Sequence, residues 1–309
     1  MTRRSALAAF TALAWTLPIA AGDADAVIRG KAGPSEIVIT TTTRLSGAIH
    51  SVKWMGKEFI DSADHGRQLQ SAASFDVGSS KDFWPEAFNP TEAGSRKDGL
   101  GPKSTSKLYG LEARGNKLTT IVQPAFWLNP GELSGKAPAK NTQVLSNHLI
   151  TKQVTIGFKQ YAHAIEYKTT FSVPKGEKHT LGQFEAVTGY MPAEFSKFWT
   201  VDPKTGQMHP LTDGPGEQVL PVVLTTADGQ FAMGVWSPDQ PSKGYETIGY
   251  GRFRFVQEKV VKWNSVFRVK DPNGIRAGNY DYRNFVVVGS AQNVRDTIVG
   301  LSKEKEFQK

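Results

Sequence analysis

Apolar and polar side chains alternate with a period of two over long stretches of this sequence, and this feature restricts the fold most strongly. Between residues 165 and 173, the alternate positions carry Ile165, Tyr167, Phe171 and Val173, interrupted by Thr169. The stretch from residue 261 to 269 repeats the pattern with Val261, Trp263, Ser265, Phe267 and Val269. A period of two over eight or more residues is typical of a strand that buries one face. We therefore expect long strands around a shared apolar core.

Further β-rich segments fill much of the remaining chain. The predicted strands lie at residues 36–42, 48–54, 58–60, 118–122, 149–158, 164–173, 218–225, 230–236, 252–256, 260–269 and 285–288. Turn signals such as Asn129-Pro130-Gly131 separate them, and no internal repeat or low-complexity linker divides the chain. We predict a mostly-β fold, one large antiparallel β-sandwich that forms a single domain over residues 27–309.

One short helix is predicted near the C-terminus. Ser290 can cap a helix from Ala291 to about Glu306. Val294, Ile298 and Leu301 recur at three- and four-residue spacing, so one face of this helix can pack on the sandwich.

The first 26 residues have the features of a cleaved export signal. Arg3 and Arg4 form a charged start, residues 6–21 are apolar apart from two threonines, and Ala24-Asp25-Ala26 fits a small-x-small cleavage pattern. The alternative is an uncleaved membrane anchor, but the apolar run is short for a spanning helix and no other long apolar stretch follows. We expect cleavage before Val27, a periplasmic or secreted location, and no transmembrane segment after cleavage.

Charge and the lack of cysteine limit the chemistry. The chain has no Cys, which excludes a Cys nucleophile and thiolate ligands, so an exported fold depends on its core alone. The net charge is +8 and is unchanged by cleavage, because two Arg and two Asp leave together. This charge favours a polyanionic partner such as an acidic polysaccharide or an anionic membrane surface, although many envelope proteins are simply basic. Nucleic acid is not expected as a partner, because no run of five Lys or Arg occurs.

The segment after Asp61 can bring a His and an Arg to the mouth of a cleft. One face of a strand there would carry His65, Arg67, Leu69, Ser71, Ala73 and Phe75. With the apolar members in the core, His65 could act as an acid or base near neutral pH and Arg67 could bind a carboxylate or a hydroxyl pair. The alternative is that both pair with Asp61 or Asp64 at a strand end.

The segment from Phe83 to Gly99 has the composition of a sugar-binding loop. Trp84 can stack on a sugar ring, and planar polar groups such as Asn89 can bridge adjacent hydroxyls. Glu92 and Asp98 could divide acid and base work if one is desolvated and the other solvated. The alternative is a packed loop that Trp84 anchors.

A third segment, residues 183–195, places Glu185 between apolar neighbours. A carboxylate in such surroundings has a raised pKa, which suits a general acid. Tyr190 follows Gly189 and could face a ligand. The alternative is a buried Glu185 paired with an Arg.

A fourth cluster is cationic. Arg252 and Arg254 share one strand face, and Lys262 and Asn264 share a face of the expected partner strand. Together they would form a strip that holds a uronate or, alternatively, a solvated outer face. Among the tryptophans, Trp127 and Trp199 are candidates for stacking on sugars, and Trp54, Trp236 and Trp263 are expected in the core.

Several catalytic motifs are missing from the sequence. It contains no G-x-S-x-G elbow, no H-E-x-x-H and no Walker loop. Its six His residues, at positions 50, 65, 148, 163, 179 and 209, have no recognisable metal-ligand spacing. A Ca²⁺ site among loop oxygens has no support in the sequence. We therefore predict no cofactor and no metal.

The export signal, the β-only chain, the His65-Gly66-Arg67 strand opening and the Asn-Pro-Thr-Glu-Ala-Gly-Ser loop at residues 89–95 resemble galactose mutarotase-like β-supersandwich proteins. That superfold includes aldose epimerases, several glycoside hydrolases and the sandwich domains of polysaccharide lyases. The paired-histidine pattern of the epimerases is missing, so no catalytic residue is carried over. The resemblance implies a concave sheet face lined with His, Arg and carboxylates, and it implies sugar chemistry by analogy of fold.

Three functions fit these residues. The first is a glycoside hydrolase on an envelope or extracellular polysaccharide, for which the catalytic candidates are Glu92, Asp98, Glu185 and His65. The substrate-binding candidates are Arg67, Trp84, Asn89, Trp127, Tyr190 and Arg252. The second is a polysaccharide lyase on a uronate polymer, in which a cation neutralises the carboxylate and a His or Tyr moves the proton. The third is a non-catalytic envelope or sugar-binding protein, in which we expect these side chains to lie apart and not in one cleft.

Overall fold

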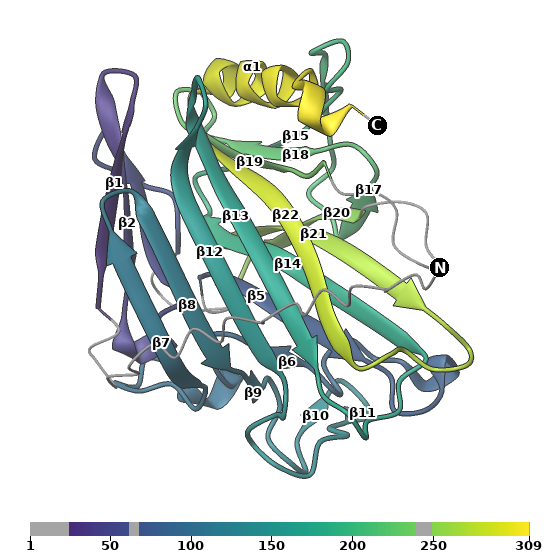
Figure 1. The fold of residues 1–309 in the computed structure, drawn as a ribbon. Coiled ribbons are helices and arrows are strands. Elements are labelled where there is room, and N and C mark those ends of the chain that lie inside the picture. The colour runs from purple at the N-terminus through teal and green to yellow at the C-terminus, as the bar shows by residue number, and fades with distance from the viewer. Residues whose placement is uncertain (1–24, 62–67, 239–248, 309) are drawn as a thin grey trace, which may run out of the picture.

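The computed structural model of the protein describes residues 25–61, 68–238 and 249–308. In these residues the chain forms two large antiparallel sheets and a short two-stranded ribbon, with an α-helix at the C-terminal end (Figure 1). The predicted mostly-β sandwich with a C-terminal helix is therefore confirmed.

The first sheet has the strand order β1-β2-β3-β5-β14-β21-β20-β17, with β4 added on β3, β6 on β5 and β9 on β6. Its strands are β1 (Val27–Ala32), β2 (Ser35–Thr41), β3 (Ile49–Trp54), β4 (Lys57–Glu58), β5 (Leu69–Phe75), β6 (Pro90–Thr91), β9 (Ala125–Phe126), β14 (Leu181–Pro192), β17 (Gly216–Gln218), β20 (Gly249–Phe255) and β21 (Val260–Lys270).

The second sheet has the strand order β16-β15-β18-β19-β22-β13-β12-β8-β7. Its strands are β7 (Lys107–Arg114), β8 (Lys117–Gln123), β12 (Leu149–Phe158), β13 (Tyr161–Val173), β15 (Lys197–Val201), β16 (Met208–Pro210), β18 (Val222–Thr225), β19 (Ala232–Trp236) and β22 (Gly278–Gly289). The ribbon pairs β10 (Leu133–Ser134) with β11 (Ala137–Pro138). Short 3₁₀ turns lie at Thr43–Leu45, Ser80–Asp82, Arg96–Asp98 and Lys305–Phe307.

The alternating strands supply the core between the sheets. Tyr167 and Phe171 of β13, and Trp263 and Phe267 of β21, are at most 2% exposed. Phe171 packs on Phe184 of β14 with a ring-centroid distance of 5.1 Å, so β13 in the second sheet contacts β14 in the first. Burial of each such ring contributes roughly 1.5–3 kcal/mol. The two alternation patterns thus predict the inward faces correctly.

The predicted strand at residues 218–225 is wrong as a single element. β17 ends at Gln218 in the first sheet, and β18 starts at Val222 in the second. Pro221 lies between them, lacks an amide hydrogen and cannot continue a strand ladder as a donor. Its carbonyl instead accepts hydrogen bonds from Val201 and Thr200 of β15.

Helix α1 (Ala291–Ser302) covers the outer side of the second sheet. The Ser290 hydroxyl accepts a hydrogen bond from the Asn293 amide, and the Asn293 side chain accepts one from the Ser290 amide, which forms a capping box. Val294, Ile298 and Leu301 are fully buried, as predicted. The helix ends at Ser302 rather than near 306.

In the described part of the chain, no helix is long and apolar enough to cross a membrane. The predicted export segment lies outside the described residues except for Asp25 and Ala26. Strand β1 starts directly after it, at Val27.

Candidate functional site

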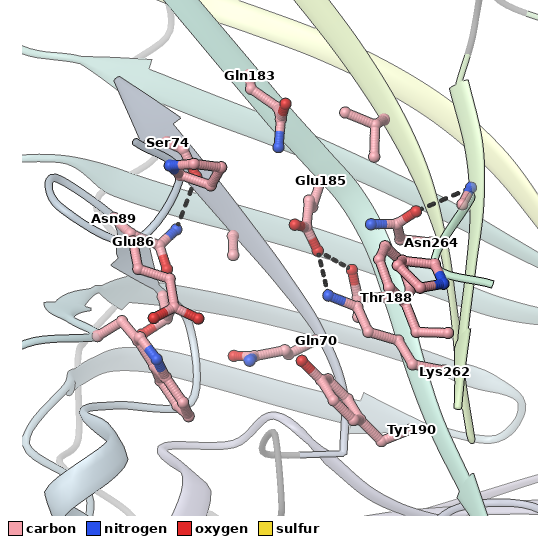
Figure 2. Close-up of a pocket in the computed structure, with 18 of the residues that line it drawn as sticks. Gln70, Ser74, Glu86, Asn89, Gln183, Glu185, Thr188, Tyr190, Lys262 and Asn264 are labelled. Carbon is pink, nitrogen blue, oxygen red and sulfur yellow. Dashed lines mark hydrogen bonds and ion pairs between the residues drawn. The ribbon is translucent and has the colours of Figure 1, made fainter. Parts of the chain in front are cut away.

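A cleft of about 840 Å³ lies on the face of the first sheet that points away from the second sheet. Alternation along β5 creates this face: Phe75 packs between the sheets, and its neighbour Ser74 points into the cleft. Strands β14, β21 and β20 continue the floor. Glu86 and Asn89, in the loop before β6, stand on the side opposite to Glu185 (Figure 2).

A β-bulge brings Glu185 and Tyr190 to the same side of β14. The register between β14 and β21 shifts between Glu185 and Val187. Odd-numbered residues face the cleft before this shift and even-numbered residues after it, so Glu185, Thr188 and Tyr190 all line the cleft. Bulges beside active sites commonly redirect side chains in this way.

Glu185 forms an ion pair with Lys262 of β21 on the cleft floor. The distance between Lys262 Nζ and Glu185 Oε2 is 3.2 Å, and the Thr188 hydroxyl donates to the same oxygen at 2.6 Å (Figure 2). The side chains of Lys262 and Glu185 are 12% and 17% exposed. Solvent therefore screens this pair less than it screens a surface ion pair.

The charge states follow from these contacts. Burial raises the pKa of Glu185, but the Lys262 charge and hydrogen bonds from Thr188 and Asn264 together outweigh burial and leave the pKa below its ordinary value. Burial lowers the pKa of Lys262, whereas Glu185 and Tyr190 raise it, and the net result is a raised pKa. Burial also raises the pKa of Tyr190. At neutral pH Glu185 is an anion, Lys262 a cation and Tyr190 a neutral phenol.

The sequence prediction of a raised pKa for Glu185 is therefore wrong. The prediction rested on apolar neighbours along the chain, but those neighbours point between the sheets. The carboxylate itself faces the ammonium group of Lys262 on another strand. Lys262 follows Glu185 by 77 residues in the sequence.

Two aromatic rings contact Lys262, and a third stacks on both of them. Phe253 and Phe255 of β20 stack with centroids 6.3 Å apart, and Tyr190 stacks on Phe255 at 6.4 Å. Lys262 Nζ lies 5.2 Å from the ring centroids of both Tyr190 and Phe253. This side of the cleft is therefore an apolar surface in contact with the largely buried ammonium group of Lys262.

A second ion pair lies farther along the floor. Arg268 donates to both carboxylate oxygens of Glu217, at 2.6 and 2.8 Å, and its Nε donates to Gln183 Oε1 at 3.1 Å. A bidentate pair of this kind has a fixed geometry. It therefore holds Gln183 and Glu217 in place at the cleft surface.

The loop before β6 is fastened to the floor by Asn89. Its side-chain amide donates to the Ala73 carbonyl at 2.6 Å and to the Ser74 hydroxyl at 3.1 Å. The main-chain carbonyl of Asn89 accepts from the main-chain amide of Trp127 at 2.8 Å. Glu86 and Trp127 line the cleft beside it. The cleft thus combines rings, amides, hydroxyls and carboxylates.

Of the residues predicted from the sequence, the structure brings Asn89, Trp127, Glu185 and Tyr190 together around this cleft. His65 and Arg67 lie outside the described residues. In the described part of the strand face to which they were assigned, Leu69, Ala73 and Phe75 are buried in the core between the sheets.

Glu92 does not line the cleft. It is fully buried between the sheets, where it forms an ion pair with Lys152, and its other carboxylate oxygen accepts from the Ser71 amide at 3.0 Å. The acid/base interpretation of Glu92 has no geometric support, because the ion pair has no access to solvent.

Asp98 and Trp84 also lie away from the cleft lining. Asp98 Oδ2 accepts from the amide and the hydroxyl of Thr105 at 2.9 and 3.0 Å, which closes its own loop. Trp84 is 47% exposed, and its indole donates to Ser134 Oγ at 2.9 Å. This contact matches the alternative of a loop anchored by Trp84.

The predicted cationic strip does not form. Arg252 pairs with Trp263 and Phe253 pairs with Lys262 in the β20–β21 ladder, so Arg252 and Lys262 point to opposite faces. The Arg252 guanidinium donates to the Thr212 carbonyl at 2.7 Å and to Gln218 Oε1 at 2.9 Å. Arg252 therefore supports the edge strand and does not line the cleft.

Sequence reasoning missed several residues that line the cleft. These are Gln70, Ser74, Glu86, Gln183, Phe253 and Arg268. Glu86 lies in the segment whose composition predicts a sugar-binding loop. That segment contains three carboxylates, Glu86, Glu92 and Asp98, and the sequence does not distinguish between them. The alternation along β5 could have indicated Gln70 and Ser74, because both stand opposite the core face.

One group of metal-ligating side chains meets among the described residues, and it lies outside the cleft lining. It consists of His148, Glu177 and His179. His148 and His179 have no metal-ligand spacing in the sequence, and folding brings both to Glu177.

No family model matches the sequence, and no curated protein matches it either. Solved structures with a similar shape include an α-galactosidase from Lactobacillus brevis, with 8% identity and a TM-score of 0.43 over 87% of this chain. They also include a galactose mutarotase-like protein from Lactobacillus casei, with 10% identity and a TM-score of 0.45 over 85% of this chain and 100% of that one. An α-mannosidase from Enterococcus faecalis has 12% identity and a TM-score of 0.48 over 85% of this chain and 30% of that one.

This chain spans 40% of the length of the Lactobacillus brevis α-galactosidase. A galactose mutarotase-like protein is among the neighbours, as expected from the architecture-level resemblance. With TM-scores below 0.5, these similarities transfer neither residues nor activity to this chain.

Proposed function

We propose that this chain is a carbohydrate-active enzyme, a glycoside hydrolase that acts on a neutral glycan in the cleft of the first sheet. The observation that carries the proposal is the Glu185–Lys262 ion pair on the cleft floor, with Glu86 on the opposite side (Figure 2) and aromatic residues in the cleft lining. Glycoside hydrolysis requires two carboxyl groups that flank the scissile bond in different protonation states.

The roles follow from the environment of each carboxyl group. Glu185 is held as an anion by Lys262, so it fits the nucleophile or base and not the acid. Glu86 is assigned to proton donation because it lines the cleft on the side opposite to Glu185 (Figure 2). Trp127 and the Phe253–Phe255 pair are assigned to stacking on the C–H faces of sugar rings.

The charge pattern of the cleft favours a neutral glycan over a uronate polymer. Each cationic side chain in the described lining lies near a carboxylate: Arg96 is 3.0 Å from Glu132, Lys262 is 3.2 Å from Glu185, and Arg268 is 2.6 Å from Glu217. Glu86 and Glu258 add further negative charge. The net charge of +8 therefore gives no uncompensated cationic site here, which argues against the lyase alternative.

A non-catalytic sugar-binding protein is the second candidate. The observation that favours it is the engagement of Glu185 Oε2 by both Lys262 and Thr188, which competes with attack on a substrate. The two candidates share the same cleft and differ in turnover.

The test is the release of reducing ends from a panel of neutral and uronic-acid glycans. We expect turnover of a neutral glycan, and a loss of about 100-fold or more in Glu86→Gln. Glu112→Gln, which changes an exposed carboxylate on β7, is the matched control and should keep full activity. Full activity in Glu86→Gln would remove the assignment, and binding without turnover would select the second candidate.

Export is part of the proposal. The charged and apolar start of the sequence and the onset of β1 at Val27 support a periplasmic or secreted protein cleaved after residue 26. N-terminal sequencing of the protein recovered outside the cytoplasm should give Val27 first.

A further inference from the structure

Two His side chains and one Glu meet at the end of the sandwich where β5 ends. His148 precedes β12, and Glu177 and His179 lie in the connection from β13 to β14. Glu177 Oε2 lies 2.8 Å from His148 Nε2 and 2.9 Å from His179 Nε2. All three ligand atoms lie within 4.8 Å of one another.

The second ring nitrogen of His179 fixes which atom faces Glu177. His179 Nδ1 is hydrogen-bonded to the main-chain carbonyl of Asp76, and a carbonyl can only accept. Nδ1 therefore carries a hydrogen, and Nε2 is the ring nitrogen that points at the carboxylate. This nitrogen–carboxylate contact needs a positive group between its two atoms, which is either a proton on Nε2 or a metal ion. An Nδ1–H bond to a backbone carbonyl is also the contact that orients most His ligands of metals.

The surroundings hold the ligands rigidly. His148 and His179 are each 3% exposed. The ring centroid of Phe75 lies 5.0 Å from that of His148 and 4.7 Å from that of His179. Glu177 is 19% exposed, so one side of the cluster is open to water. Such an arrangement provides three fixed ligands and an open position for a fourth.

We propose that His148, Glu177 and His179 bind a divalent transition metal, with zinc as the ion that this ligand set fits best. Zinc takes imidazole nitrogen and carboxylate oxygen at about 2.0–2.2 Å, which places neighbouring tetrahedral ligands roughly 3.3 Å apart. The two distances between Glu177 Oε2 and the His Nε2 atoms, 2.8 and 2.9 Å, would have to increase by about 0.5 Å to reach that separation. The fourth ligand is a water molecule that enters from the exposed side of Glu177.

The role of this site is structural. Phe75 faces the cluster and the core, whereas Ser74, its neighbour on β5, faces the cleft, so the cluster and the cleft lie on opposite sides of the first sheet. The metal would join the segment before β12 to the β13–β14 connection, two segments that are about 30 residues apart in the chain. The inference is independent of the proposed hydrolase activity.

The test uses the purified protein after treatment with a chelator. Dialysed against Zn²⁺ and then against metal-free buffer, the protein should retain about one equivalent of zinc by atomic emission. Saturating Zn²⁺ at about a hundredfold excess over Kd should raise Tm by about 5–10 °C. Glu177→Gln and His179→Gln should abolish both effects, whereas His209→Gln, which changes an exposed His on β16, should keep both.

Two outcomes would overturn the proposal. One is a wild-type protein that retains no zinc above the buffer level and shows no Tm shift, which would identify the cluster as an ionic hydrogen-bond group only. The other is equal zinc retention in wild type and Glu177→Gln. The wild-type measurement decides even if a His variant does not fold.

Discussion

Replacing Glu92 with Gln tests whether this carboxylate belongs to the core or to catalysis. The change keeps the shape of the side chain and removes its charge, which leaves the Lys152 ammonium without its partner. Both side chains are fully buried, and the Lys152 ammonium is hydrogen-bonded to Glu92 and to the Gly47 carbonyl, the latter at 3.5 Å. Sequence composition suggested an acid or base, but the structure places Glu92 between the two sheets.

The expected cost is large. Removing one partner of a buried ion pair costs about 3–5 kcal/mol, because the remaining charge stays buried. For a chain of this size, each kcal/mol lowers Tm by about 2–4 °C, so the expected shift is about 6–20 °C. Urea unfolding followed by Trp fluorescence, together with calorimetry, measures both quantities. Glu112→Gln serves as the exposed control and should shift Tm by less than about 2 °C.

The double variant Glu92→Gln/Lys152→Met isolates the pair. Because Met leaves no buried charge, the double variant should lose less stability than the sum of the single variants. A Glu92→Gln protein with an unchanged Tm and no turnover would refute this reasoning and return Glu92 to the catalytic candidates.

Two further predictions concern the cleft, and a third concerns Arg252, which lies outside the cleft lining. Because the pKa of Glu185 is lowered in the folded protein, its ion pair stabilises the fold at pH values above the ordinary carboxyl pKa. This stability is lost as the pH falls through the pKa of Glu185 in the folded protein. In acid, the free energy of unfolding should therefore fall more in wild type than in Glu185→Gln. Trp127→Ala should weaken glycan binding about five- to tenfold by calorimetric titration, because a stacking ring contributes roughly 1 kcal/mol, and it should leave the neighbouring fold intact by circular dichroism. Arg252→Gln should lower Tm by a few degrees without changing turnover, because its guanidinium binds Thr212 and Gln218 outside the cleft lining; lost turnover at unchanged Tm would contradict this placement.

The long strands could be predicted because one simple period governs them. In β13 and β21 every second residue meets the opposite sheet, so Tyr167 and Trp263 were assigned to the core from the sequence alone. The capped helix at Ser290 could be predicted for the same kind of reason, since both of its signals are local.

The site depends on geometry that a period of two does not contain. The bulge between Glu185 and Val187 changes which residues of β14 face the cleft. In the β20–β21 ladder Phe255 pairs with Val260. This register places the side chains of Arg252 and Lys262 on opposite faces of the sheet. A shift of one residue in either register reverses the face of every side chain that follows.

Long-range partners explain the errors on Glu92 and Glu185. Glu92 meets Lys152 and Glu185 meets Lys262 only after the strands assemble. The pKa and burial of a carboxylate follow from such partners and not from its neighbours in the chain.

The central question is where the glycan binds. We would titrate the protein with the glycan selected in the reducing-end assay and follow the indole N–H resonances of the six Trp residues that follow Val27 by NMR. We expect the Trp127 resonance to shift and those of Trp84 and the buried Trp263 to stay unchanged. A shift of Trp84 or Trp199 with Trp127 unchanged would place the glycan elsewhere and contradict the assignment of the cleft.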